Sequence, residues 1–212
     1  MLHNIIGDGN VSKIKNVFVI DSSVEIILES GVFLKDYYED SVINLFNSVA
    51  DDIVGVEIFD QVRLDGIIRD YCDRDVVFNV SKLFLKLASH EMGCTIYEYI
   101  GEFSDYPSVM YCHGSNEIIV YSDIRNIDAN ANDVIVYSID GCINYKGIDY
   151  LIFDIDKCYT VTDILNFLFN LDRSNVLLSS NDDIVFDFAV GLGIPFVKIN
   201  DLSLIDSFFS RL

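Results

Sequence analysis

The clearest indication of the fold comes from residues 151–200, LIFDIDKCYTVTDILNFLFNLDRSNVLLSSNDDIVFDFAVGLGIPFVKIN. Apolar runs that suit buried strands alternate in it with runs of helical periodicity, in the order strand, helix, strand, helix, strand. Thr160 and Thr162 can cap the first helix, Asn181 can cap the second, and Gly193 can end it. This alternation is typical of a parallel sheet, which binds ligands at the carboxyl ends of its strands. We therefore expect functional residues at that edge.

A second signal opens the chain. Residues 15–20, KNVFVI, form a continuous apolar run that predicts a buried strand ending at Asp21. Ser22 and Ser23 suit the N-cap of a helix, which we expect over residues 23–30.

Further elements follow from periodicity. Apolar positions at helical spacing predict helices over residues 40–50 and 75–92, and residues 53–59 read as a strand. Residues 62–68 fit either a strand or a helix. Between residues 94 and 150 the sequence consists of short runs that resemble β-strands, beginning with TIYEYI and separated by Gly, Asn and Pro.

The predicted fold class is α/β, with a mainly parallel sheet flanked by helices. We expect an N-terminal α/β part at residues 1–93, a β-rich insertion at residues 94–150, and a C-terminal α/β part at residues 151–212 that completes one domain. The last twelve residues, DLSLIDSFFSRL, predict a terminal helix.

The charge balance limits the classes of function. The chain has 34 Asp and Glu against 14 Lys and Arg, a formal net charge of −20, which disfavours sequence-independent binding to nucleic acid and suits a basic protein partner. It has neither a signal-peptide pattern nor an apolar run of about 20 residues, so we expect a soluble cytoplasmic protein without a membrane span. The 5 cysteines form no CxxC pair, which predicts reduced thiols. A composition rich in Ile, Asn and Asp would suit a virus, phage or low-GC bacterium.

Carboxylates fall at several predicted strand ends and helix starts: Asp21, Glu57, Asp154, Asp156, Asp182 and Asp183. Mg²⁺ prefers oxygen ligands and can activate water against a phosphodiester. If these strand ends meet at one edge of the sheet, the acids form a candidate metal site.

The two ends of the chain resemble the PIN-like family of metal-dependent nucleases. VFVIDSSVEIIL (17–28) is similar to the strand, Asp, hydroxyl residue and short helix that open such domains, while TDILNFLFNL (162–171) and NVLLSSNDDIVFDFAVGLGIPFVKI (175–199) are similar to their closing elements. The resemblance implies a nuclease for RNA or DNA that binds Mg²⁺ or Mn²⁺. It also implies a set of acids that catalyse the hydrolysis or bind the metal: Asp21, Glu57, Asp156, Asp163, Asp182 and Asp183. A catalytically inactive relative that keeps the fold is the alternative.

Other interpretations stay open. YLIFDIDKCYT (150–160) resembles the first motif of haloacid dehalogenase-like phosphatases, which implies Asp154 as nucleophile and Asp156 as general acid. VFVIDSSVEI is similar to the metal-site segment of von Willebrand A domains, with Glu25 at a position where that family has Ser. A non-catalytic acidic protein that binds a basic partner is the alternative outside the enzymes.

Overall fold

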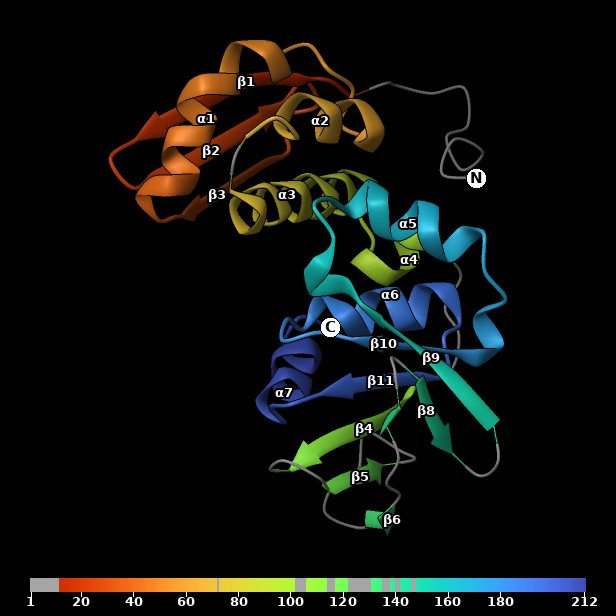
Figure 1. The fold of residues 1–212 in the computed structure, drawn as a ribbon. Helices are drawn as coiled ribbons and strands as arrows, with labels where there is room; N and C mark the ends of the chain where they lie inside the picture. Colours follow the sequence, from red (N-terminus) through yellow and green to blue (C-terminus); the bar gives the residue numbers. More distant parts are fainter. Residues whose placement is uncertain are drawn as a thin grey trace. The chain divides into compact units, whose positions relative to one another are not determined.

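A computed structural model describes residues 12–71, 73–101, 106–113, 117–121, 131–134, 138–139, 142–145 and 148–212 (Figure 1). The chain divides into two compact units. The first comprises Met1–Cys94 with Cys158–Phe167, and the second Thr95–Lys157 with Leu168–Leu212. The first boundary therefore falls one residue after the predicted end of the N-terminal part. That the three predicted parts complete one domain stays a prediction.

The second unit is built on a mixed sheet, and the predicted α/β class is confirmed. Its described strands follow the order β6-β5-β4-β11-β10-β9-β8-β7, and the four central strands are parallel. These are β4 (Ser108–His113), β11 (Phe196–Ile199), β10 (Val176–Ser179) and β9 (Ile148–Asp154). The outer strands are antiparallel: β5 (Glu117–Tyr121), β6 (Ala131–Val134), β7 (Ser138–Ile139) and β8 (Cys142–Tyr145).

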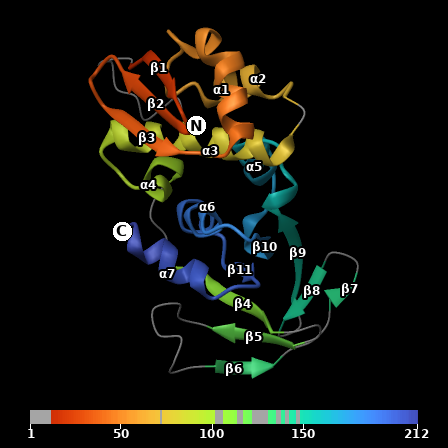
Figure 2. The same ribbon diagram turned by 90° about the vertical axis from the view of Figure 1, so that its left-hand side faces the viewer.

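Helix α6 (Ile184–Leu192) is the apolar centre of the second unit, because all of its residues are buried. It packs against β10 and β11, as Figures 1 and 2 show. The helix ends at Gly193 in the left-handed conformation, as predicted. The predicted terminal helix is also confirmed as α7 (Ser203–Ser210), and a short 3₁₀ turn, η3 (Arg173–Asn175), precedes β10.

Helix α4 (Ile96–Ile100) crosses α6 at unusually short range. The prediction of a β-like run at TIYEYI is wrong, because Thr95 and Glu98 form a capping box that starts a helix there. A Cβ added to Gly191 would lie 2.6 Å from the Tyr97 carbonyl oxygen, and one added to Gly101 would lie 1.9 Å from the Gly191 oxygen. Only glycine at both positions permits this approach.

The first unit has a three-stranded antiparallel sheet in the order β1-β2-β3. Its strands are β1 (Ile14–Ile20), β2 (Ser23–Leu28) and β3 (Phe33–Tyr37). Helix α1 (Asp40–Ile53) lies against one side of this sheet (Figure 2). Helices α2 (Gln61–Ile68) and α3 (Arg74–Met92) complete the unit with the first part of α5 (Val161–Phe169). The helices predicted over residues 40–50 and 75–92 are confirmed, and residues 62–68 are helical.

Three expectations for the N-terminal region are wrong. Residues 23–28 are strand β2 and not a helix: Val24, Ile26 and Leu28 are buried in alternation, which is the period of a strand. Strand β1 belongs to an antiparallel hairpin and has one exposed face, so it is not a buried strand. Residues 53–59 contribute only an isolated bridge between Lys13 and Glu57.

A buried carboxylate on α2, Asp65, joins three helices of the first unit. Its Oδ1 accepts hydrogen bonds from Ser81 Oγ on α3 at 2.6 Å and from Gln61 Nε2 at 2.8 Å. Its Oδ2 accepts one from the Thr162 N–H at 2.9 Å, and the Val161 N–H donates to Ser81 Oγ at 2.8 Å. Side chains of α2 and α3 thus satisfy the free N–H groups that begin α5. Burial raises the pKa of Asp65, while these hydrogen bonds oppose the shift.

The predicted cap of α5 is confirmed in part. Thr160 Oγ1 accepts a hydrogen bond from the Asp163 N–H at 3.2 Å, whereas Thr162 is the second residue of the helix and not its cap. No helix within the described ranges is long and apolar enough to cross a bilayer.

We predict that Gly191→Ala lowers the free energy of unfolding by about 2–3 kcal/mol, because its Cβ meets backbone atoms of α4 that cannot rotate away. Gly66→Ala is the control: nothing lies within 4 Å of its added Cβ, and alanine in a helix is favoured over glycine by about 0.5–1 kcal/mol. Urea unfolding followed by circular dichroism measures both. Equal stability of the two variants would contradict the close helix crossing.

Candidate functional site at the carboxyl ends of the parallel strands

Three neighbouring parallel strands of the second unit end at the same edge of the sheet, and polar residues lie at or directly after their ends. Asp154, the last residue of β9, pairs in register with Ser179, the last residue of β10, and Ser179 pairs with Lys198 of β11. The strand ends are therefore level, and the residues that follow them lie at one edge of the sheet. The predicted gathering of polar groups at this edge is present in the second unit.

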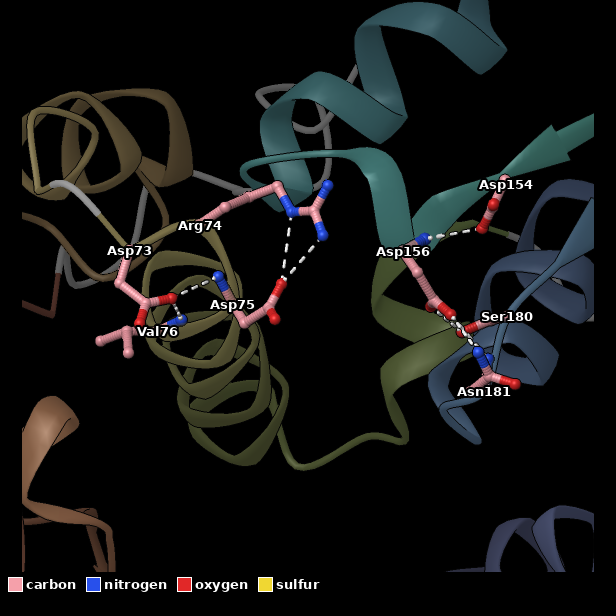
Figure 3. A network of polar contacts seen from close by, with 8 residues as sticks. All are labelled: Asp73, Arg74, Asp75, Val76, Asp154, Asp156, Ser180 and Asn181. Carbon is pink, nitrogen blue, oxygen red and sulfur yellow. Dashed lines mark hydrogen bonds and ion pairs between the residues drawn. The ribbon is translucent and has the colours of Figure 1, made fainter.

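The carboxylate of Asp156 is the centre of the cluster (Figure 3). It lies in a 3₁₀ turn, η2 (Ile155–Lys157), directly after β9. Oδ1 accepts a hydrogen bond from Ser180 Oγ at 2.5 Å. Oδ2 accepts two from Asn181, at 2.9 Å from its N–H and at 3.0 Å from Nδ2. Both carboxylate oxygens are thus occupied by donors of the loop that follows β10.

Two flanking acids also have local partners. Asp154 Oδ1 accepts the Asp156 N–H at 3.3 Å, and its Oδ2 forms an ion pair with Lys157 at 3.2 Å. Asp182 Oδ1 accepts the Ile184 N–H at 3.0 Å, one residue before the N-cap position of α6, which is Asp183 and not the expected Asn181.

Asp183 and Asp187 connect α6 to the C-terminal helix. Arg211 pairs with Asp183 at 3.3 Å and with Asp187 at 2.9 Å, and the Ser207 hydroxyl donates to Asp183. Burial raises the pKa of Asp187 to about 6, and Arg211 opposes that rise. The arrangement attaches α7 to α6 through a buried charge.

The remaining predicted acids belong to the first unit. Asp21 lies in the β1–β2 turn with a positive φ of 53°, Glu57 forms the bridge to Lys13, and Asp163 pairs with Arg69 at 2.9 Å. The acid set implied by the nuclease resemblance is therefore divided between the two units, and the helix expected after Asp21 is strand β2. The structure brings Asp156, Asp182 and Asp183 to one strand-end region.

These strand-end residues do not fit a divalent cation. A hard cation needs several oxygen lone pairs directed at one point. The oxygens of Asp156 instead receive N–H and O–H donors, and no three acids, histidines or cysteines of the described residues form a group that could hold a metal. Binding of Mg²⁺ or Mn²⁺ therefore stays a prediction of the sequence resemblance.

A polar cluster at the start of α3, in the first unit, is a second candidate (Figure 3). Asp73 caps the helix by accepting the N–H groups of Asp75 and Val76, while Arg74 pairs with Asp75 at 3.1 Å. Together with Tyr159 these residues line a wide, open depression. Because its charges satisfy one another and the cap, it is a weaker candidate than the strand ends.

The sequence reasoning overlooked several residues of these clusters. Ser180 and Asn200, whose Nδ2 donates to Asn181 Oδ1 at 3.3 Å, follow predicted strands, and this position was the signal that could have identified them. Asn181 was expected only as a helix cap. Asp187 is the single charge in the apolar run IVFDFAVGL, a pattern that indicates a buried and paired carboxylate. Asp65 had no comparable signal, because polar and apolar residues mix in its helix.

Comparison with known proteins assigns no family. No family model matches the chain, and no curated protein sequence matches it. The resemblances to nucleases and phosphatases thus depend on the sequence segments quoted above.

We predict that Asp156→Ala lowers the free energy of unfolding by about 1–3 kcal/mol, because Ser180 and Asn181 lose their shared acceptor. Asp154→Ala is the matched control and costs less than about 1 kcal/mol, since it removes an exposed ion pair. Thermal unfolding is recorded with and without millimolar Mg²⁺. A Mg²⁺-dependent rise in melting temperature that Asp156→Ala abolishes would contradict a purely structural carboxylate.

Asp187 predicts a pH dependence of stability. Its pKa rises from 3.8 in the unfolded chain to about 6 in the folded one, so the folded protein binds the proton more tightly. The free energy of unfolding therefore falls by about 1–3 kcal/mol as the pH rises from about 4 to about 6. Asp187→Asn removes this fall, whereas the exposed control Asp206→Asn retains it. Urea unfolding at several pH values tests this, and an unchanged slope in Asp187→Asn would refute it.

Proposed function

We propose that the protein is a non-catalytic binding protein whose acidic surface holds a basic segment of another protein. The observation that carries the proposal is the exposed face of helix α1. Its solvent-facing residues are Asp40, Asn44, Asn47, Ser48, Asp51 and Asp52, and the helix contains neither lysine nor arginine.

The acids of α1 lie on one side of the helix. Asp40, Asn44, Asn47 and Asp51 follow at intervals of four, three and four residues, which keeps them on a single face. Within the described residues no lysine or arginine forms an ion pair with Asp40, Asp51 or Asp52. Their charges are therefore open to an external partner.

Two of these acids stand where they weaken the helix. Asp51 and Asp52 lie in its last turns, where the helix dipole is negative and each carboxylate costs about 0.3–1 kcal/mol. No basic residue in the last turn compensates for them. Helix stability would favour lysine or arginine at this end, so binding is a better explanation for the acids than folding is.

The bulk charge supports the same kind of partner. A formal net charge of −20 attracts cationic segments over about one Debye length, 8–10 Å at ordinary salt, and repels polyanions. In the second unit, both carboxylate oxygens of Asp156 accept intramolecular hydrogen bonds, so this strand-end acid is a weaker candidate for binding a partner. Binding to α1 is thus expected to be electrostatic and to weaken as salt increases.

The length of the acidic face defines a suitable probe. From Asp40 to Asp52 the helix rises about 18 Å, which about six residues of extended peptide match. We predict that a fluorescent peptide of about six to eight alternating lysines and arginines binds the protein, and that the triple variant Asp40→Asn, Asp51→Asn, Asp52→Asn weakens binding about tenfold. Fluorescence anisotropy at several salt concentrations measures this.

A matched variant separates the α1 face from net charge. Glu29→Gln, Asp70→Asn, Asp206→Asn removes the same number of charges from exposed positions elsewhere and should change the affinity by less than about threefold. Equal weakening by both triple variants would show that only bulk charge matters. Cleavage of labelled RNA or DNA with Mn²⁺, lost in Asp182→Asn, would replace this proposal with the nuclease interpretation.

A further inference from the structure

The outward face of the three-stranded sheet in the first unit is apolar. Phe18 and Ile20 of β1 are 45% and 55% exposed, and Phe33 and Tyr37 of β3 are 59% and 75% exposed. Ile27 of β2 is partly exposed between them. Single exposed apolar residues are common, but a contiguous set on one regular surface marks an interaction site.

The strand register places these residues on the same side. Ile27 lies opposite Phe33, and Ser23 lies opposite both Ile20 and Tyr37. A bulge between Ile14 and Asn16 reverses the side to which β1 residues point. Ile14 is therefore buried in the core, while the later residues of β1 alternate toward the outward face.

The opposite side of the sheet already has its partner. Val24, Ile26 and Leu34 are buried there, and helix α1 packs against β1 and β2 (Figure 2). None of the other described helices of this unit makes more than slight contact with the sheet. The outward face is thus the surface of this layer that has no partner within the described part of the unit.

The charges on the outward face are balanced. Glu25 of β2 lies opposite both Phe18 and Lys35, and the Lys35 Nζ is 3.9 Å from a Glu25 carboxylate oxygen. Glu25 lies on the middle strand and Lys35 on the edge strand β3, between Phe33 and Tyr37 on the same side of that strand. On a chain with a net charge of −20 this face is locally neutral, so it does not fit the basic segment proposed for α1.

We propose that this face binds the same face of a second copy of the chain. A two-fold axis that runs along the strands, midway between β2 and β3, places each Glu25 over Lys35 of the second copy. The same operation places each Phe33 over Ile27 of the second copy, because those residues are also opposite one another. Charge and shape are then self-complementary, as a symmetric homodimer interface requires.

The physical consequences are specific. Two sheets stacked face to face separate by about 10 Å, with interleaved side chains. This axis stacks only β2 and β3 on their counterparts and leaves β1 at the rim, so the interface is small and the dissociation constant is expected to be micromolar. Because two copies with a net charge of −20 repel one another, added salt should tighten the dimer. Binding of a basic peptide to α1 has the opposite salt dependence, so the two proposals are separable.

Sedimentation velocity over about 1–500 µM protein, in low and in moderate salt, is the test. We expect a monomer–dimer equilibrium that Phe33→Ser weakens at least tenfold. Val62→Ser, which removes an apolar side chain that is 67% exposed on α2, should leave it unchanged. Circular dichroism checks that each variant is folded.

Two charge-reversal variants separate a loss of association from a loss of folding, because mixing them should restore association. Glu25→Lys and Lys35→Glu should each weaken self-association about tenfold, because each places like charges face to face across the interface. An equimolar mixture of the two variants should form heterodimers, since every facing pair is then opposite in charge. Wild-type protein that stays monomeric at about 0.5 mM, or variants that dimerise like wild type, would overturn the proposal.

Discussion

The first unit depends on the buried carboxylate of Asp65. Burying this charge is costly, and it is tolerated because three donors from α2, α3 and α5 surround it. In return, Asp65 and Ser81 satisfy the first N–H groups of α5, a helix that follows strand β9 of the other unit in the chain. The chain thus leaves the second unit at Lys157, is anchored in the first, and returns at Leu168. No apolar contact alone would specify where α5 begins.

The acids of this protein fall into two groups with different roles. Asp65, Asp156 and Asp187 accept hydrogen bonds or pair with arginine inside the fold, and their oxygens are used by the protein itself. The acids on α1 have no such partners among the described residues, and two of them oppose the dipole of their helix. The net charge of −20 counts both groups alike and does not show which carboxylates already have a partner inside the fold. Binding is best sought among the second group.

The first unit has two surfaces of different chemistry, the acidic face of α1 and the apolar outward face of the sheet. Helix α1 covers one side of the sheet and presents acids to solvent, while the other side of the sheet presents aromatic and aliphatic residues around one ion pair. The proposed electrostatic binding to α1 would weaken with salt, and the proposed apolar contact between like-charged copies would strengthen with it. A dimer through the sheet would leave both α1 helices facing outward, so one assembly could bind two basic segments.

Local patterns predicted the C-terminal half well. Strands β10 and β11, helices α6 and α7, and the left-handed Gly193 agree with the sequence, because an apolar run, a helical period and a glycine stop coincide there. At residues 23–28 the serines suggested a helix cap, yet the alternation of Val24, Ile26 and Leu28 was the stronger signal and forms a strand. At residues 95–100 the aromatic and β-branched residues suggested a strand, but the Thr95 and Glu98 capping box starts a helix.

The sequence by itself determined the α/β class and most of the helices. It also determined that carboxylates lie at or just after the ends of strands β9 and β10. Only the tertiary structure decided which carboxylates are free. The partners of Asp156 lie 24 and 25 residues away along the chain, and the Thr162 N–H that binds Asp65 lies 97 residues away. Local propensity carries no information over such separations, because these hydrogen bonds exist only after the strands and helices have packed.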